Sequence, residues 1–128
     1  MDTLTTRGIS ISVETEYWPP YSQPARAHYV FAYRIFIQNT GNQPVQLTRR
    51  YWRVTSGSGD VRLVDGPGVI GETPTLQPGE AYDYTSWCQL QTPVGCMEGY
   101  YTMESRKSKE CFPVFVPKFT LAAPWKLN

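Results

Sequence analysis

Alternation of apolar and polar residues is the feature that most constrains how this chain folds. From Ile9 to Tyr17, apolar side chains at positions 9, 11, 13 and 17 are separated by serines, glutamates and a threonine. Residues 29–37 and 82–88 repeat the pattern. A period of two points successive side chains to opposite faces, so each stretch predicts a half-buried β-strand. No window of eleven residues combines helical periodicity with capping residues, and the sequence therefore predicts an all-β protein.

Four further stretches complete an expected set of seven or eight strands. They cover residues 44–56, 61–64, 97–103 and 112–116, with turn-forming or polar residues between them. Within the first of these, the apolar phase shifts between Leu47 and Trp52, and a bulge near Arg49 and Arg50 would produce such a shift. We expect Pro117 to end or bulge the last strand, because proline cannot donate to a sheet.

This spacing of strands and turns predicts an antiparallel β-sandwich of the immunoglobulin or fibronectin type III class. The chain has 128 residues, of which 41% are hydrophobic, enough to bury a core as one domain. We find no internal repeat and no linker, so we expect a single domain over residues 1–128 with a core at about residues 8–121.

Charge and cysteine content narrow the classes of function. A formal net charge of +1 does not fit a dedicated nucleic-acid binder, which needs a strongly basic surface for the phosphate backbone. The N-terminal residues contain no apolar signal region, and no stretch is long enough to span a membrane. Without an export signal, Cys88, Cys96 and Cys111 are expected to be reduced thiols in a cytoplasmic protein.

Residues 65–74, DGPGVIGETP, contain the GxGxxG spacing of a dinucleotide-binding turn. Such a turn needs a helix after it to receive the pyrophosphate, and Pro74 and Pro78 leave no room for one. A weaker hypothesis is a small-anion site, because consecutive amides of a glycine turn can form an anion-binding nest. Its residues would be Gly66, Gly68, Val69, Ile70 and Gly71, together with Arg50 and Arg62. The alternative is a loop whose glycines only permit positive φ angles and close packing.

Catalysis, metal binding and cofactor binding have little support in the sequence. His28 is the single histidine, and no nucleophile can be placed beside it, so we predict a protein that is not an enzyme. No metal site and no cofactor are expected. Direct weak binding of magnesium by carboxylates such as Glu14, Glu16 and Glu104 is an alternative, although carboxylates on alternating strands usually form the solvent face.

The aromatic residues suggest a binding surface. Tyr17, Trp18 and Tyr21 flank a proline-rich connection, where they could face solvent and contact a partner protein, since tyrosine and tryptophan dominate binding hot spots. The alternative is that they cover the open end of the sandwich. Trp52 is expected in the core.

Motifs along nearly the whole chain resemble those of the ApaG family, also called CorD in bacteria. They are YVFAY at 29–33, PVQL at 44–47, RYW at 50–52, VDGPGVIG at 64–71, LxPGE at 76–80, YTS at 84–86, GxMxGxY at 95–101 and FxVxVPxF at 112–119. The resemblance implies a fibronectin-III-like or immunoglobulin-like sandwich. It also implies an indirect link to cobalt resistance and magnesium efflux, and a protein-interaction role.

These observations together favour a non-catalytic cytoplasmic module that binds a protein partner. A small-anion binder, for pyrophosphate or a nucleotide polyphosphate held by residues 66–71, is the first alternative. Direct weak binding of magnesium or cobalt is the second.

Overall fold

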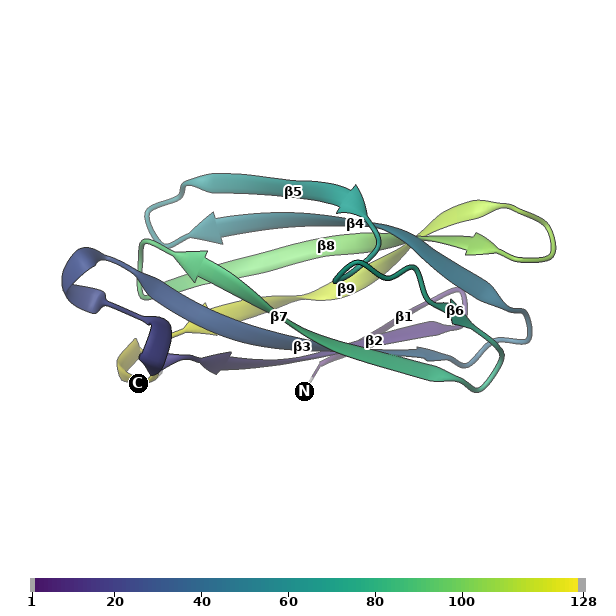
Figure 1. Ribbon diagram of the computed structural model, residues 1–128, viewed down its shortest axis with the longest axis horizontal. Coiled ribbons are helices and arrows are strands. Elements are labelled where there is room, and N and C mark those ends of the chain that lie inside the picture. Colours follow the sequence, from purple (N-terminus) through teal and green to yellow (C-terminus); the bar gives the residue numbers. More distant parts are fainter. Residues whose placement is uncertain (1, 127–128) are drawn as a thin grey trace.

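The computed structural model of the protein describes residues 2–126, which form two antiparallel β-sheets packed face to face (Figure 1). One sheet has the strand order β1-β2-β3-β7, and the other has the order β5-β4-β8-β9 with β6 paired to β4. The strands are β1 (Thr3–Thr6), β2 (Ile9–Tyr17), β3 (Tyr29–Asn39), β4 (Val45–Ser56), β5 (Val61–Pro67), β6 (Thr75–Leu76), β7 (Ala81–Leu90), β8 (Val94–Ser105) and β9 (Cys111–Ala122). The predicted all-β sandwich is confirmed.

Two strands of the nine in the described range were not expected from the sequence. The first, β1, precedes the expected core, and its four residues are mostly exposed. The second, β6, has only two residues. Strands this short carry too few alternating positions to give a periodic signal.

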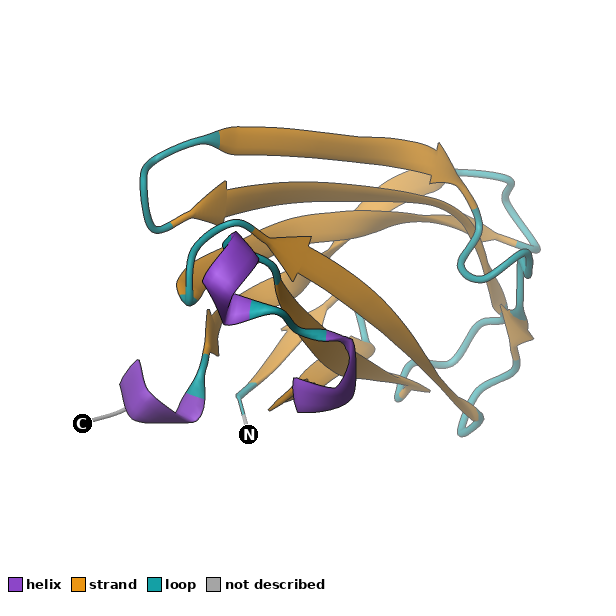
Figure 2. Ribbon diagram, turned by 60° about the vertical axis from the view of Figure 1, so that its left-hand side comes forward, coloured by secondary structure: helices purple, strands orange, loops and turns teal. Residues whose placement is uncertain are grey.

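Helical structure within residues 2–126 is limited to three single turns of 3-10 helix (Figure 2). They are η1 (Pro19–Tyr21), η2 (Pro24–Arg26) and η3 (Pro124–Lys126), and each begins at a proline. Proline presets the φ angle of a first helical turn, which explains these positions. None of the described helices is long and apolar enough to cross a membrane.

Bulges interrupt the second sheet at two places. The register between β4 and β8 shifts between Leu47 and Arg49, which confirms the bulge expected there. The extra residue lets both Leu47 and Trp52 point into the core. A second shift, between Met97 and Gly99 of β8, places the extra residue of β9 beside Pro117. The strand bulges there and continues to Ala122.

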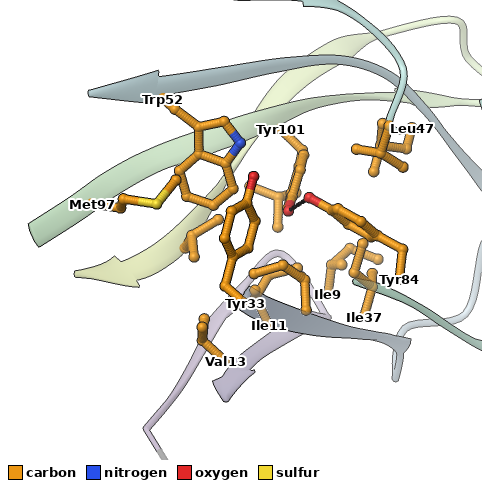
Figure 3. Packing of buried hydrophobic residues seen from close by; sticks show 14 of the residues in the cluster. Ile9, Ile11, Val13, Tyr33, Ile37, Leu47, Trp52, Tyr84, Met97 and Tyr101 are labelled. Atoms are coloured by element: carbon orange, nitrogen blue, oxygen red, sulfur yellow. Dashed lines mark hydrogen bonds between the residues drawn. The ribbon is translucent and has the colours of Figure 1, made fainter. Parts of the chain in front are cut away.

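The core lies between the two sheets and is built from the inward positions of each strand (Figure 3). The first sheet contributes all the buried isoleucines of this cluster, among them Ile9, Ile11 and Ile37, and the second contributes Trp52 and Met97. Aromatic rings of the two sheets also meet between them, as in the pairs Tyr33–Trp52 and Tyr84–Tyr101. Trp52 is buried, as the sequence predicts.

Candidate functional site

The glycine loop, residues 66–74, closes on itself through backbone hydrogen bonds. The amide of Gly68 donates to the carbonyl of Thr48 at 2.8 Å, and Val69 and Glu72 exchange hydrogen bonds of 2.8 and 2.9 Å. Between them, Ile70 and Gly71 have φ angles of 47° and 74°, which makes a two-residue hairpin turn with both central residues left-handed. The next regular element is the strand β6, so no helix follows the loop.

Only part of the amide set of this loop is free for a ligand. The amides of Gly68, Val69 and Glu72 already donate to carbonyls of the protein. Within residues 2–126, the amides of Ile70 and Gly71 make no backbone hydrogen bond. A Cβ atom on Gly68 would lie 2.3 Å from the carbonyl oxygen of Glu72, so close packing of the turn accounts for this glycine.

Arg50 supports the glycine loop, and Arg62 does not reach it. One terminal nitrogen of Arg50 donates to the carbonyls of Pro67 and Gly68 at 2.9 and 3.0 Å, with the guanidinium beside Gly66. Arg62 instead donates to the carbonyl of Gln89 in the opposite sheet at 3.1 Å. Arg62 lies four residues from Gly66 along β5, about 13 Å at the rise of an extended strand. The structure thus brings one of the two predicted arginines to the loop.

Three tyrosines, Tyr33, Tyr84 and Tyr101, lie in the core. The hydroxyls of Tyr84 and Tyr101 are hydrogen-bonded to each other between the sheets (Figure 3). Burial raises the pKa of Tyr84 and Tyr101 above the ordinary value, and the Arg50 charge offsets part of this effect. Burial likewise raises the pKa of Tyr33. All three are therefore neutral hydroxyl groups at neutral pH, available as hydrogen-bond partners and not as charges.

A cluster of three aromatic rings, two of them exposed, lies on the outer side of the first sheet, and we call it the aromatic surface. It consists of Trp18, Tyr21 and Trp87. The ring centroid of Trp87 lies 5.1 Å from that of Trp18 and 5.9 Å from that of Tyr21, both in edge-to-face arrangements. Tyr21 is 63% exposed and Trp87 is 47% exposed. Edge-to-face packing fixes the rings relative to one another, and Tyr21 and Trp87 still keep a large exposed area.

Hydrogen bonds hold the connection that carries Trp18 and Tyr21. The amide of Trp18 donates to the carbonyl of Val30 at 2.8 Å. The hydroxyl of Ser22 donates to the carbonyl of Trp18 at 2.8 Å and accepts from the amide of Val30 at 2.9 Å. Because η1 lies between these contacts, the aromatic surface is anchored to β3 at both ends of the turn.

Two of the three predicted partner-binding residues belong to the aromatic surface, and one does not. Tyr17 is half-buried and packs against Phe31 and Trp125, with ring centroids 5.4 and 5.5 Å away. Trp87 was not predicted as part of a site. The phase of its strand could have identified it, because Tyr84 and Cys88 are inward and Trp87 is therefore outward.

The outer side of the second sheet carries another aromatic row. Tyr51 stacks on Tyr100 with ring centroids 5.0 Å apart, and Tyr100 contacts Phe115 edge-on at 5.9 Å. Each ring in this row comes from a different neighbouring strand: β4, β8 or β9. Cross-strand aromatic pairs of this kind stabilise a sheet, which gives the row a structural role.

No group of three or more metal-binding side chains comes together within the described range of residues 2–126. His28 forms an isolated backbone bridge with Gln23 at the end of the η2 connection. Glu104 is paired with Arg106, whose terminal nitrogen lies 2.5 Å from its carboxylate. Neither His28 nor Glu104 is therefore part of a group of metal-binding side chains within the described residues.

Comparison with known proteins agrees with the motifs. A model of the ApaG domain matches residues 19–105. The ApaG protein of Acidithiobacillus ferrooxidans is 50% identical over 115 residues, covering 90% of each chain. The ApaG protein of Paramagnetospirillum magneticum is 45% identical over 124 residues, covering 97% of this chain and 95% of that one.

A solved structure is similar to this chain over most of its length. The crystal structure of the Bordetella pertussis ApaA protein matches with a TM-score of 0.87 and 42% identity, covering 91% of this chain and 94% of that one. The C-terminal domain of wzt, at 8% identity and a TM-score of 0.56, shares the fold alone. The family model, the curated relatives and the solved structure agree over most of the length, and the chain belongs to the ApaG family.

Proposed function

We propose that this domain is a non-catalytic, cytoplasmic protein-binding module that contacts its partner through the aromatic surface. The single observation that carries the proposal is the exposure of Tyr21 and Trp87 in a cluster that the fold holds in place. Rigid, exposed tyrosine and tryptophan side chains bind with little loss of side-chain entropy, and they dominate hot spots of protein interfaces. In this proposal the domain affects cobalt resistance and magnesium efflux indirectly, by binding that partner.

Partner recovery from a native lysate, compared between matched variants, tests this function. We expect Tyr21→Ala and Trp87→Ala to lose the recovered partner, because each removes one ring from the proposed interface. Phe115→Ala removes a ring that is 45% exposed on the opposite sheet and should leave recovery unchanged. Loss of the partner in the Phe115 variant alone would move the interface to the other face and refute the proposal.

A second candidate function, small-anion binding, is favoured by the backbone conformation of Ile70. A β-branched residue with φ of 47° is strained, and Ile70 is 59% exposed, so packing of its side chain does not explain the conformation. Strain of this kind concentrates at functional positions. The amides of Ile70 and Gly71 would then receive the anion, such as pyrophosphate, at the outer tip of the loop.

Titration with pyrophosphate or ATP, followed by amide NMR, tests this second function. Binding should shift the amide signals of Ile70 and Gly71 most, since these are the donors without a protein acceptor. Arg62→Gln is a suitable control, because Arg62 contacts Gln89 and should not alter the titration. Unmoved signals across residues 66–71 at millimolar ligand would exclude anion binding.

A further inference from the structure

A groove runs across the outer side of the first sheet, next to the aromatic surface. It encloses about 570 Å³ and is lined by residues of three neighbouring strands. They are Val13, Glu14, Thr15 and Glu16 of β2, Ala32 and Arg34 of β3, and Thr85 of β7. Ligand sites commonly enclose roughly 300–1,000 Å³, so this groove is large enough to receive one or two side chains of a partner.

The floor of the groove is low because a small residue lies between two long ones. Glu16 is directly opposite Ala32 in the register of β2 and β3, and Ala32 is directly opposite Trp87 in the register of β3 and β7. Neighbouring strands are about 4.8 Å apart, which places Glu16 and Trp87 about 10 Å apart across the alanine. A long side chain laid over Ala32 would have a carboxylate on one side and an indole ring on the other.

The carboxylates of this groove are not neutralised by the arginine beside them. Arg34 lies directly opposite Glu14 in the strand register, yet its guanidinium is turned away. Its Nε and a terminal nitrogen donate to Asp83 at 3.0 and 2.7 Å, and the guanidinium lies over the ring of Phe36 at 4.8 Å. Within residues 2–126, neither Glu14 nor Glu16 forms an ion pair.

We propose that the groove binds an arginine or lysine side chain of a basic segment in the partner protein. This inference rests on the proposed function, since Ala32 of the groove lies directly opposite Trp87 of the aromatic surface in the strand register. The charge is complementary, because Glu14 and Glu16 would receive the cation, and the indole face of Trp87 would add a cation–π contact. Arginine fits better than lysine, because its planar fork binds a carboxylate through two hydrogen bonds and stacks on an aromatic ring.

Titration of the ¹⁵N-labelled protein with a blocked Gly-Arg-Gly peptide tests the inference. The peptide should shift the amide signals of residues 14–16 and 32 and the indole signal of Trp87. Replacing its arginine by citrulline keeps the shape and removes the charge, and should weaken binding about tenfold, as expected from losing two exposed ion pairs and a cation–π contact. Equal binding of the two peptides, or no shift of these signals, would overturn the inference.

Carboxylate variants locate the contact. Glu14→Gln and Glu16→Gln together should weaken binding of the arginine peptide part of the way to that of the citrulline peptide, because the ion pairs are lost and the contact with Trp87 remains. Glu98→Gln removes one carboxylate charge on the second sheet, in the groove beside Tyr100, and should have no effect. If Glu98→Gln weakened binding as much as the double variant, the attraction would be non-specific and the inference wrong.

The two proposals fail in different ways. If Tyr21→Ala and Trp87→Ala abolish partner recovery but the arginine peptide does not bind, the aromatic surface remains the interface and the basic partner segment is excluded. If the peptide binds in the groove but those two variants leave partner recovery unchanged, the groove is a cation site and the proposed function is wrong.

Discussion

The glycine loop and the aromatic surface differ in whether a sequence motif marks groups that are exposed and free to bind. The loop has a recognisable spacing, and most of its polar groups are already satisfied by the protein: three amides donate to carbonyls, and Arg50 donates to two more. The aromatic surface has no sequence motif, yet it leaves two large rings substantially in solvent. A recognisable spacing can thus serve the fold, whereas exposure of large rings points to binding.

Mutations in the two regions should therefore have different effects. Changes in the loop should reduce the free energy of unfolding strongly, because its groups hold one another. Changes in the aromatic surface should affect stability little and partner binding strongly.

Gly68→Ala should have the largest effect on stability. The new Cβ would lie 2.3 Å from the carbonyl oxygen of Glu72, a backbone atom that cannot move without opening the turn, and the φ of 60° adds strain. We expect a loss of about 3 kcal/mol in the free energy of unfolding, measured by urea denaturation.

Gly71→Ala is the matched control for that variant. Its φ is 74°, but nothing lies within 4 Å of the added Cβ, so only the backbone strain remains. A loss of about 1 kcal/mol is expected. Equal losses in the two variants would mean that the close contact at Gly68 relaxes freely, and that the loop is less tightly held than its hydrogen bonds indicate.

Arg50→Met should lower the free energy of unfolding by about 2 kcal/mol, because the carbonyls of Pro67 and Gly68 lose a charged donor. The neighbouring Arg49 pairs with Asp65 at 3.2 Å, and both side chains are more than half exposed. Arg49→Met should therefore change stability by about 0.5 kcal/mol or less. If the two variants lost the same stability in urea denaturation, Arg50 would not be a specific support of the loop.

The fold was predictable from the sequence because burial on one side of a sheet leaves a period-two pattern. The pattern located the long strands and the bulge at Leu47–Arg49, where the phase of the apolar residues changes. It could not locate β1, whose residues are mostly exposed, because a strand without a buried face has no contrast between its two faces.

The candidate sites were predictable only in part. Trp18 and Tyr21 lie together, but the sequence could not show that Tyr17 turns toward Phe31 or that Trp87 joins the cluster from a strand far along the chain.

The arginines of the glycine loop show the same limit. Arg50 and Arg62 are close in sequence to the loop, and only the direction of each side chain distinguishes the one that contacts it. Such contacts depend on tertiary packing, which local spacing does not encode.

Ile70→Asn should increase stability and so show that the loop tip is strained. Asparagine tolerates left-handed backbone more readily than a β-branched residue, and we expect a gain of about 1 kcal/mol in the free energy of unfolding. Ile70→Val keeps the branched Cβ and should give no gain. Absence of a gain in the asparagine variant, measured by urea denaturation, would remove the strain argument for a functional loop tip.

Tyr21→Ala should have a small effect on stability, and this prediction separates the two regions most clearly. Tyr21 is 63% exposed, and its ring contacts are with the partly exposed Trp18 and Trp87 at 6.4 and 5.9 Å. Losing them should lower the free energy of unfolding by about 0.5 kcal/mol. Urea denaturation of the variant used for partner recovery provides the measurement.

A loss as large as that of Gly68→Ala would mean that Tyr21 holds the connection between β2 and β3 in place, and weak partner recovery would then follow from unfolding. A small loss combined with weak recovery assigns the exposed ring to binding, because a side chain that contributes little to the fold can affect the partner only by contacting it.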